Sequence, residues 1–383
     1  MTTAFDNARD VVLIHSGSEY FDYCCHLIDA AKHTIHLQTY IFESDRTGQR
    51  IKQHLIEAAA RGVKVFLLLD GFGSKGIDNA DVDEMKRDGI TLRFFSPLNR
   101  TRPFRLGRRL HHKVLVTDEQ YALVGGINIS DAYSGFDGNK PWFDYALYIE
   151  GEVCIKLNKI CLSLFNKKYI PTKLFFNQGK VKEELLIRFR QCDFIRGKQE
   201  ITKSYKEFIS NAKKEIVIVN AYFLPGLRMR RLMQKAVNRG VQISVLLSAK
   251  SDVPVVKRAM NYYYSWLFRN KIHVYEYRPT NVHAKVAVFD SELITLGSYN
   301  LNYLSEYISV ELNVDVKYQQ IASELSLEIQ KIIQSDCVHS ANNFYIHTNV
   351  FSRFLDFLSY QLIIYAMRFL FTLTEKERIN ILK

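Results

Sequence analysis

The 383-residue chain is poor in proline and cysteine. It contains 7 prolines and 6 cysteines, and the cysteines stand at positions 24, 25, 154, 161, 192 and 337 without a CxxC pair. Few prolines and a hydrophobic share of 47% argue against a disordered chain. The scattered cysteines argue against a disulfide framework or a zinc site, and they favour reduced thiols in a cytoplasmic protein.

Long apolar runs and a signal peptide are also lacking. Residues 1–17 are mixed and acidic, and no run reaches about 18 uninterrupted apolar residues, so we expect neither a signal peptide nor a membrane span. The nearest approach is FLDFLSYQLIIYAMRFLFTL at 354–373, which Asp356, Gln361 and Arg368 interrupt. These interruptions suit an interfacial helix better than a spanning one, and a core or dimer-interface helix is the equal alternative.

What the chain does have is one sparse polar pattern, present twice. From each His the Lys lies 2 residues on, the Asp 7, the first Gly 14 and the Asn 17. Packing alone would preserve apolar positions and let polar ones drift, so this duplication indicates two functional half-sites. The first copy is His111, Lys113, Asp118, Gly125, Gly126 and Asn128, and the second is His283, Lys285, Asp290, Gly297, Ser298 and Asn300.

Each copy predicts a strand, a turn and a second strand. Side chains two apart on a strand share a face, so each His emerges beside its Lys, whereas His112 points the other way and is expected to be structural. Asp118 and Asp290 fall in the turns and are more structural than chemical, although they belong to the motif. The Gly-Gly and Gly-Ser pairs let the backbone approach a ligand, which makes Gly126 and Ser298 substrate-binding candidates.

The residue types in each copy suit the handling of phosphate. An imidazole can attack phosphorus or move a proton near neutral pH. Ammonium and amide donors, here Lys113, Lys285, Asn128 and Asn300, stabilise charge on the non-bridging oxygens. Two facing half-sites would supply two histidines with opposite tasks, one as nucleophile and the other as general acid and base, which makes the reaction ping-pong. Such chemistry requires neither a metal nor a cofactor.

The chain resembles the phospholipase D superfamily, whose mark is a duplicated HxKxxxxD motif followed by a Gly-rich turn and Asn. It most resembles the bacterial cardiolipin synthase branch, in the short form without N-terminal membrane spans. The likeness covers nearly all of residues 10–320. Stretches that carry it include QTYIFESDRTG, AAARGVKVFLLLDGFGS, GGINISDAY and WFD in the first half, and NAYFLPG, AVNRGVQISVLLSAKSDVP and ELNV in the second.

An internal repeat supports a two-lobed α/β fold with mixed sheets. AKHTIHLQTYIF (31–42) aligns with AKKEIVIVNAYF (212–223), and RGVKVFLLLD (61–70) aligns with RGVQISVLLS (239–248). The resemblance implies two similar phospholipase D-like lobes with pseudo-twofold symmetry and one active site at their seam. We expect lobes over 1–180 and 181–345, followed by an apolar helical tail over 346–383.

The resemblance also implies a reaction: a phosphatidyl group moves from phosphatidylglycerol to a second phosphatidylglycerol, giving cardiolipin and glycerol. We expect His111 to be the nucleophile, forming a phosphohistidine, and His283 to be the general acid and base, although the order could be reversed. By the same resemblance, Asp144 and Glu311 orient the imidazoles; the sequence does not tell which carboxylate serves which histidine. Tyr40 and Tyr222 occupy matched strand ends and either line the cleft or pack in the core.

The net charge of +12 bears on partners. An arginine cluster directly before the first motif is expected to give the entrance of that half-site a positive charge, which attracts anionic head groups and an anionic bilayer. Arg108 and Arg109 are the substrate-binding candidates of this cluster. We expect a cytoplasmic enzyme attached peripherally to the inner face of the membrane. Nucleic acid is the rival partner, because the superfamily includes nucleases; a hydrolase and other head-group transferases also remain. The cluster is Arg100, Arg102, Arg105, Arg108 and Arg109.

Overall fold

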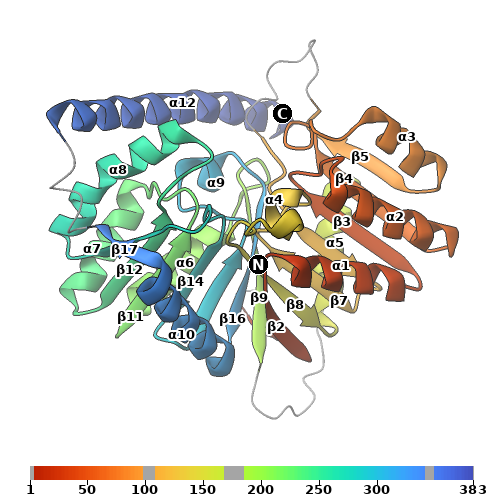
Figure 1. The fold of residues 1–383 in the computed structure, drawn as a ribbon, viewed down its shortest axis with the longest axis horizontal. Coiled ribbons are helices and arrows are strands. Elements are labelled where there is room, and N and C mark those ends of the chain that lie inside the picture. The colour runs from red at the N-terminus through yellow and green to blue at the C-terminus, as the bar shows by residue number, and fades with distance from the viewer. Residues whose placement is uncertain (1–3, 98–107, 168–184, 341–348, 383) are drawn as a thin grey trace.

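Two mixed β-sheets, one from each half of the chain, form the centre of the protein (Figure 1). The structure is a computed structural model that describes residues 4–97, 108–167, 185–340 and 349–382. The first sheet contains β2 (Asp10–His15), β3 (Thr34–Thr39), β4 (Lys64–Asp70), β5 (Thr91–Phe95), β6 (Val114–Thr117), β7 (Tyr121–Gly125) and β8 (Tyr145–Glu150). The second contains β9 (Leu186–Asp193), β11 (Glu215–Asn220), β12 (Gln242–Ser248), β13 (His273–Tyr277), β14 (Lys285–Phe289), β15 (Leu293–Gly297) and β16 (Glu311–Lys317).

The two sheets repeat one strand order. The first runs β2-β8-β7-β6-β3-β4-β5 and the second β9-β16-β15-β14-β11-β12-β13, with the last three strands of each parallel and the others antiparallel. The predicted fold of two similar α/β lobes is therefore confirmed. Three short strands extend the second sheet, and the first of them comes from the N-terminus of the chain. These strands are β1 (Asp6–Asn7), β10 (Lys198–Gln199) and β17 (Cys337–His339).

The helices repeat as well, and they divide the apolar core into layers. The first half contains α1 (Ser18–Ala30), α2 (Arg46–Ala60), α3 (Asn79–Arg87), α4 (Asp131–Ser134), the 3-10 turn η2 (Phe136–Gly138) and α5 (Val153–Phe165). The second contains α6 (Glu200–Asn211), α7 (Leu227–Asn238), α8 (Pro254–Arg269), α9 (Tyr303–Tyr307) and α10 (Gln319–Asp336). Helices α1–α3 pack on the outer face of one sheet and α6–α8 on the outer face of the other.

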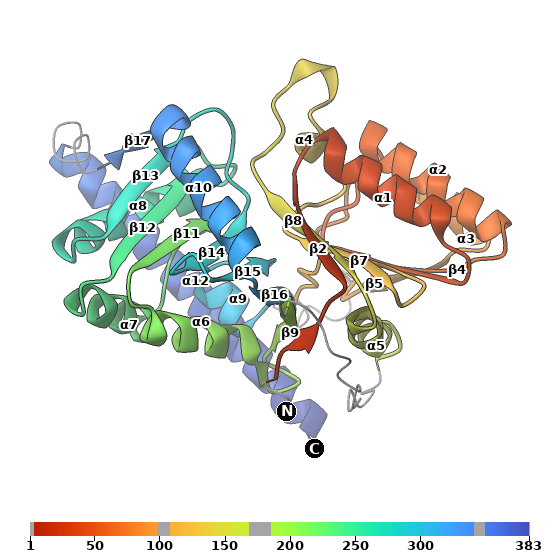
Figure 2. The same ribbon diagram turned by 90° about the horizontal axis from the view of Figure 1, so that it is seen from below.

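A third core lies between the lobes, which stand side by side in Figure 2. It joins apolar side chains of β6 and β14 to those of α5 and α10, so that the inner faces of both sheets are buried against each other's lobe. Burial of this shared surface is roughly proportional to the apolar area removed from water, and it stabilises the lobes as one body. A cavity at their seam is therefore held in a fixed geometry.

The repeated Arg-Gly-Val sequence shows why the two halves share polar as well as apolar positions. Helices α2 and α7 both end before it, and its glycines adopt left-handed backbone, with φ of 89° at Gly62 and 93° at Gly240. The guanidinium of Arg61 donates to backbone carbonyls at the end of α1, and that of Arg239 donates to carbonyls at the end of α6. The sequence thus ends one helix and caps its neighbour in both lobes.

The long helix α12 (Val350–Leu382) lies outside both lobes. It runs across α8 and reaches α9, along the upper edge of the second lobe in Figure 1. The aromatic run 262–268 belongs to α8, where Tyr263, Tyr264 and Leu267 are buried, which agrees with the packing interpretation of that run. The expected boundary near residue 180 lies outside the described residues.

Candidate active site

The two motifs form matched hairpins, and the turn of each hairpin lies beside the start of the neighbouring parallel strand. Three residues separate the last paired positions of each hairpin, and the first two of them have positive φ, 52° and 58° in the first hairpin and 53° and 55° in the second. The carboxylate of Asp118 accepts hydrogen bonds from the backbone N–H groups of residues 32–34, and Asp290 does the same with residues 213–215. Each aspartate therefore ties its hairpin to the start of the neighbouring strand, a position that supports a structural role.

Short cross-lobe β-bridges bring the two histidines to the seam. Leu110 pairs with Val310, and Phe143 pairs with Val282, so the segment before each histidine lies along the segment before the other half's carboxylate. The backbone N–H of His111 donates to the Val310 carbonyl at 2.9 Å. Both histidines precede regular strand: β6 begins at Val114 and β14 at Lys285, slightly later than the motif predicts.

His111 is held by a carboxylate of the other half. Its Nδ1 lies 2.9 Å from Oε2 of Glu311 and 3.0 Å from the Ser298 carbonyl. The Ser298 hydroxyl donates to the same oxygen of Glu311, and Ser305 donates to Oε1 at 2.7 Å. Burial alone would raise the pKa of Glu311, but His111 and the hydroxyl donor hold it below its usual value. A buried, ionised carboxylate therefore stands behind this imidazole.

His283 has the mirrored arrangement with a different environment. Its Nδ1 lies 2.6 Å from Oδ2 of Asp144, a residue of the first half. Gly126 occupies the position that Ser298 has in the other half, and a Cβ there would lie 2.4 and 2.5 Å from the carboxylate oxygens of Asp144. Burial raises the pKa of Asp144 to about 6. The pKa of His283 is lowered well below its usual value by burial and then by nearby lysine charges.

The two lysines bring positive charge into the seam. Nζ of Lys113 donates to the His111 carbonyl at 2.8 Å, and Nζ of Lys285 donates to the His283 carbonyl. Burial lowers the pKa of Lys285 to about 8 and that of Lys113 well below its usual value. The charge of Lys285 adds to the lowering of the Lys113 pKa, and an anion near the two lysines would relieve that cost. The site is therefore suited to an anionic group.

The motif asparagines tie the Gly-rich turns to the ends of the parallel strands. Oδ1 of Asn128 accepts from the backbone N–H of Ile41, and Oδ1 of Asn300 accepts from that of Tyr222. The amide of Asn128 also donates to the Tyr133 hydroxyl at 2.8 Å. Both asparagines also line the cavity described next, so residues at the same position of the two motifs have the same place in the two halves of the site.

A single cavity of about 650 Å³ contains both histidines. Glu311 and both motif asparagines also line it, whereas Gly126, Ser298, Asp144 and the two lysines are not among its lining residues. Its aromatic side chains come mostly from the first half, and its aliphatic side chains come mostly from the second half and from α12. The aromatic group is Tyr40, Phe72, Tyr133, Trp142 and Tyr222, and the aliphatic group is Ile41, Leu224, Val253, Val256, Leu304, Ile308, Met367 and Leu370.

Comparison with known families agrees with this geometry. The family model for the cardiolipin synthase PLD-like domain matches the chain twice, over residues 24–144 and 205–333, so each match contains one motif. The protein belongs to this family. The matches include the two carboxylates, Asp144 and Glu311, as well as both histidines.

Relatives within the cardiolipin synthase family are similar over most of their length. The chain is 31% identical to cardiolipin synthase B of Salmonella typhi over 344 residues, covering 88% of this chain and 83% of that protein. It is 30% identical to cardiolipin synthase B of Escherichia coli K12 over 346 residues, with the same coverage. A cardiolipin synthase of Geobacillus thermodenitrificans is also 30% identical, over 83% of this chain and 65% of that one.

Solved structures show the same fold at low identity. A phosphatidylserine synthase from Haemophilus influenzae Rd KW20 has a TM-score of 0.75 and 16% identity, with 96% of each chain covered. A polyphosphate kinase from Porphyromonas gingivalis has a TM-score of 0.62 and 16% identity, over 87% of this chain and 48% of that one. At this identity, the likeness shows the two-lobed fold alone.

Of the two described arginines of the cluster, one lines the cavity and the other does not. Arg109 lines it and is held by the Ser96 carbonyl at 2.8 Å and by Asp70 at 3.3 Å. Arg108 instead pairs with Asp193 at 2.6 Å and lies over the Phe95 ring, and it is not a lining residue. The other three members, Arg100, Arg102 and Arg105, lie outside the described residues.

Two aromatic neighbours of His283 were not among the predicted site residues. Its ring lies 5.2 Å from the ring of Tyr133, edge to face, and 6.0 Å from that of Trp142. Tyr40 has the corresponding place beside His111, at 5.2 Å. Tyr133 follows its motif asparagine by five residues, the interval that separates Ser305 from Asn300, so extending the repeat would have found it. His112 is buried against Gln38, as expected of a structural residue.

Proposed function

We propose that this protein is a phosphatidyltransferase that makes cardiolipin from two phosphatidylglycerol molecules and releases glycerol. The observation that supports it best is the pair of histidines in one cavity, each held at Nδ1 by a carboxylate of the opposite half. With Nδ1 engaged, Nε2 is the nitrogen available for chemistry on each ring. Membership of the cardiolipin synthase family and the similarity to cardiolipin synthase B proteins support the same reaction.

In the first step, Nε2 of His111 attacks the phosphorus of one phosphatidylglycerol. The bond between phosphorus and the head-group glycerol oxygen breaks, and His283 gives its Nε2 proton to that oxygen while its Nδ1 takes the proton that it shares with Asp144. In the second step, neutral His283 takes a proton from a hydroxyl of the second phosphatidylglycerol. The resulting oxygen attacks phosphorus, the phosphorus–nitrogen bond breaks, and both histidines return to their starting states.

The unequal carboxylates support this assignment of roles. A phosphorylated imidazole that keeps its Nδ1 proton is positively charged, and ionised Glu311 behind His111 would stabilise that charge. Asp144 behind His283 has a pKa raised to about 6 by burial, so this pair exchanges a proton near neutral pH. Lys113, Lys285 and the amides of Asn128 and Asn300 supply the positive charge and donors for the phosphate oxygens. None of these steps uses a metal or a cofactor.

The apolar wall of the cavity favours a lipid over a nucleic acid. Seven aliphatic side chains from the second half and α12 line it, and acyl chains pack against such a surface, whereas a nucleic acid would leave it in water. We place the enzyme at the cytoplasmic face of an anionic membrane, attached peripherally. The net charge of +12 supports attraction to that surface, and six unpaired cysteines, five of them buried, suit a reducing compartment.

The deciding experiment is product analysis after incubation with phosphatidylglycerol vesicles. We expect cardiolipin and free glycerol in equal amounts, and no product with His111→Ala. Phosphatidic acid without cardiolipin would make the protein a hydrolase, because water would then be the acceptor in the second step. Absence of any lipid product would reject a lipid substrate, and single-stranded and double-stranded DNA would be the next substrates.

A further inference from the structure

Helix α12 has two opposite apolar faces. At about 100° per residue, the exposed large apolar side chains that follow Val350, the first residue of the helix, fall within an arc of about 80° up to residue 369. They are Phe351, Phe354, Leu358, Leu362, Tyr365 and Phe369, whose exposed fractions range from 44% to 69%. We call these six residues the outer row. They span about 27 Å of helix at 1.5 Å per residue.

The inner face of α12 is part of the folded protein. The Tyr360 ring stacks on Tyr262 of α8 at 4.8 Å, and Phe371 packs on Tyr303 of α9 at 5.6 Å. Met367 is buried and, with Leu370, lines the catalytic cavity. Among the described residues, α12 is the helix long and apolar enough to cross a membrane. Packing along α8 keeps it flat against the protein, so it suits the membrane surface better than a spanning position.

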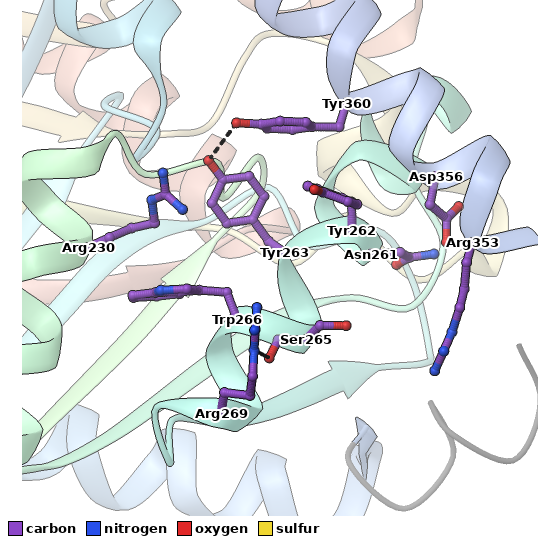
Figure 3. A pocket seen from close by; sticks show the side chains of 10 residues that line it. All are labelled: Arg230, Asn261, Tyr262, Tyr263, Ser265, Trp266, Arg269, Arg353, Asp356 and Tyr360. Carbon is purple, nitrogen blue, oxygen red and sulfur yellow. Dashed lines mark hydrogen bonds between the residues drawn. The ribbon is translucent and has the colours of Figure 1, made fainter.

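Arginine and aromatic side chains line a groove at the junction of α7, α8 and α12, on the side of α12 that faces α8 (Figure 3). Arg230, Arg269 and Arg353 line this groove, and the Arg230 guanidinium lies over the rings of Tyr263 and Trp266 at 5.1 and 5.6 Å. Nε of Arg230 is buried without a hydrogen-bond partner among the described residues. Asp356, the carboxylate among the described residues of the groove, pairs with Arg258 at 3.3 Å.

We propose that the outer row is the surface by which the enzyme sits on an anionic phospholipid bilayer, and that α12 thereby joins the bilayer to the catalytic cavity. The outer row enters the acyl region at the boundary with the head groups, while the arginine groove meets lipid phosphates. Because the opposite face of the same helix forms part of the cavity wall, a lipid that leaves the bilayer along α12 reaches the histidines without crossing water. This inference rests on the proposed function for its substrate, and it assigns the docking surface itself.

A second copy of the chain is the competing occupant of the outer row. Two features favour the bilayer. The groove is basic, which repels an identical groove across a two-fold axis but attracts phosphatidylglycerol. The inner face of the helix also continues into a cavity whose wall suits acyl chains, which a dimer contact would not require.

The test compares Leu362→Glu/Phe369→Glu with Leu327→Glu, a matched control in which an exposed apolar residue of α10, 58% exposed, is replaced far from α12. Co-sedimentation is measured with phosphatidylglycerol and with phosphatidylcholine vesicles. Turnover is measured on vesicles and on dihexanoyl phosphatidylglycerol below its micelle concentration. We expect the double variant to lose at least tenfold in vesicle binding and vesicle turnover, but less than twofold in turnover of the dispersed lipid. The control should match the wild type in all assays.

Undiminished vesicle binding by the double variant would overturn the inference. So would an equal loss of turnover on dispersed lipid, because the outer row would then act through folding or the cavity. Sedimentation equilibrium tests whether a second copy of the chain covers the outer row. If the wild type is a dimer and the double variant is a monomer that still binds vesicles, the outer row is an interface between two copies of the chain. If the wild type makes no product from either lipid while vesicle binding still depends on the outer row, the proposed function fails and the docking surface stands.

Discussion

The two half-sites have the same backbone and different chemistry around the carboxylate. In the half that supplies Glu311, the hydroxyls of Ser298 and Ser305 donate to it, and its pKa is held low. In the half that supplies Asp144, the matching positions are Gly126 and Tyr133, and the Tyr133 hydroxyl accepts from an asparagine instead. A duplicated framework can therefore present two histidines that are equal in position and unequal in charge environment.

The largest expected effect comes from removing either histidine. His111→Ala and His283→Ala should each lower turnover by roughly a thousandfold or more, because the first variant lacks the nucleophile and the second lacks the general acid. Incubation with donor labelled at phosphorus, followed by acid quench, separates their roles. Label should stay on the protein in His283→Ala and be absent in His111→Ala. The opposite pattern would exchange the two roles while leaving the reaction unchanged.

Substitutions of the small residues next to the two carboxylates should have the next largest effect on turnover, and the loss should differ between the two half-sites. Gly126→Ala places a methyl group 2.4 Å from the Asp144 carboxylate, so the carboxylate must move away from His283 and turnover should fall about a hundredfold. Ser298→Gly removes one hydrogen bond to Glu311 and should cost about tenfold, with a stability loss of about 1–2 kcal/mol. Steady-state rates and urea unfolding measure both. Equal losses would contradict the asymmetry described above.

The carboxylates should also differ in how they link stability to pH. Burial raises the pKa of Asp144 to about 6, so between about pH 4 and 6 the folded state holds more protons at this group than the unfolded state. Its contribution to stability therefore falls as the pH rises through this window, and Asp144→Asn should remove that fall. Glu311 has a lowered pKa, so its contribution is lost as the pH falls below about 4.5, and Glu311→Gln should remove that loss. Urea unfolding at a series of pH values measures both slopes; the same slope change in both variants would refute the difference.

The smallest effect on turnover should come from the motif aspartates. Asp118→Ala and Asp290→Ala each release three backbone N–H groups at the start of a strand, so each should lower the free energy of unfolding by about 1–3 kcal/mol. Turnover per folded molecule should stay within about threefold of the wild type, and the two variants should behave alike. A loss comparable to that of the histidine variants would assign these aspartates to the chemistry.

Much of the fold could be predicted because the repeat is visible in the sequence. The matched RGV segments and the matched motifs predict two lobes of one topology, and the strand orders agree. The separation of the turn aspartates from the cavity could also be predicted, from their place between two short strands. The pairing of His111 with Glu311 and of His283 with Asp144 could not, because it depends on how the lobes pack and no local pattern encodes that packing.

Two other features needed the structure because they depend on distant partners. Arg108 stands next to Arg109 in the sequence, but an ion pair with Asp193 turns it away from the cavity. The apolar tail predicted either an interfacial helix or a packed one, and α12 has a face of each kind, since its inner residues pack on α8 while its outer row is exposed. Periodicity shows that a helix has apolar faces; only the fold shows which of them is covered.

The cross-lobe bridges have a consequence for how the enzyme folds. The contacts that hold His111 and His283 join residues 200 and 139 positions apart in the chain. Closing chain segments of this length costs entropy before the contact is gained, and proteins rich in such contacts fold slowly. Apart from the pairs β2–β8 and β1–β9, each sheet pairs residues that are nearer in the chain, and the site is completed only when the two lobes meet. Recovery of activity after dilution from denaturant should therefore lag behind recovery of secondary structure.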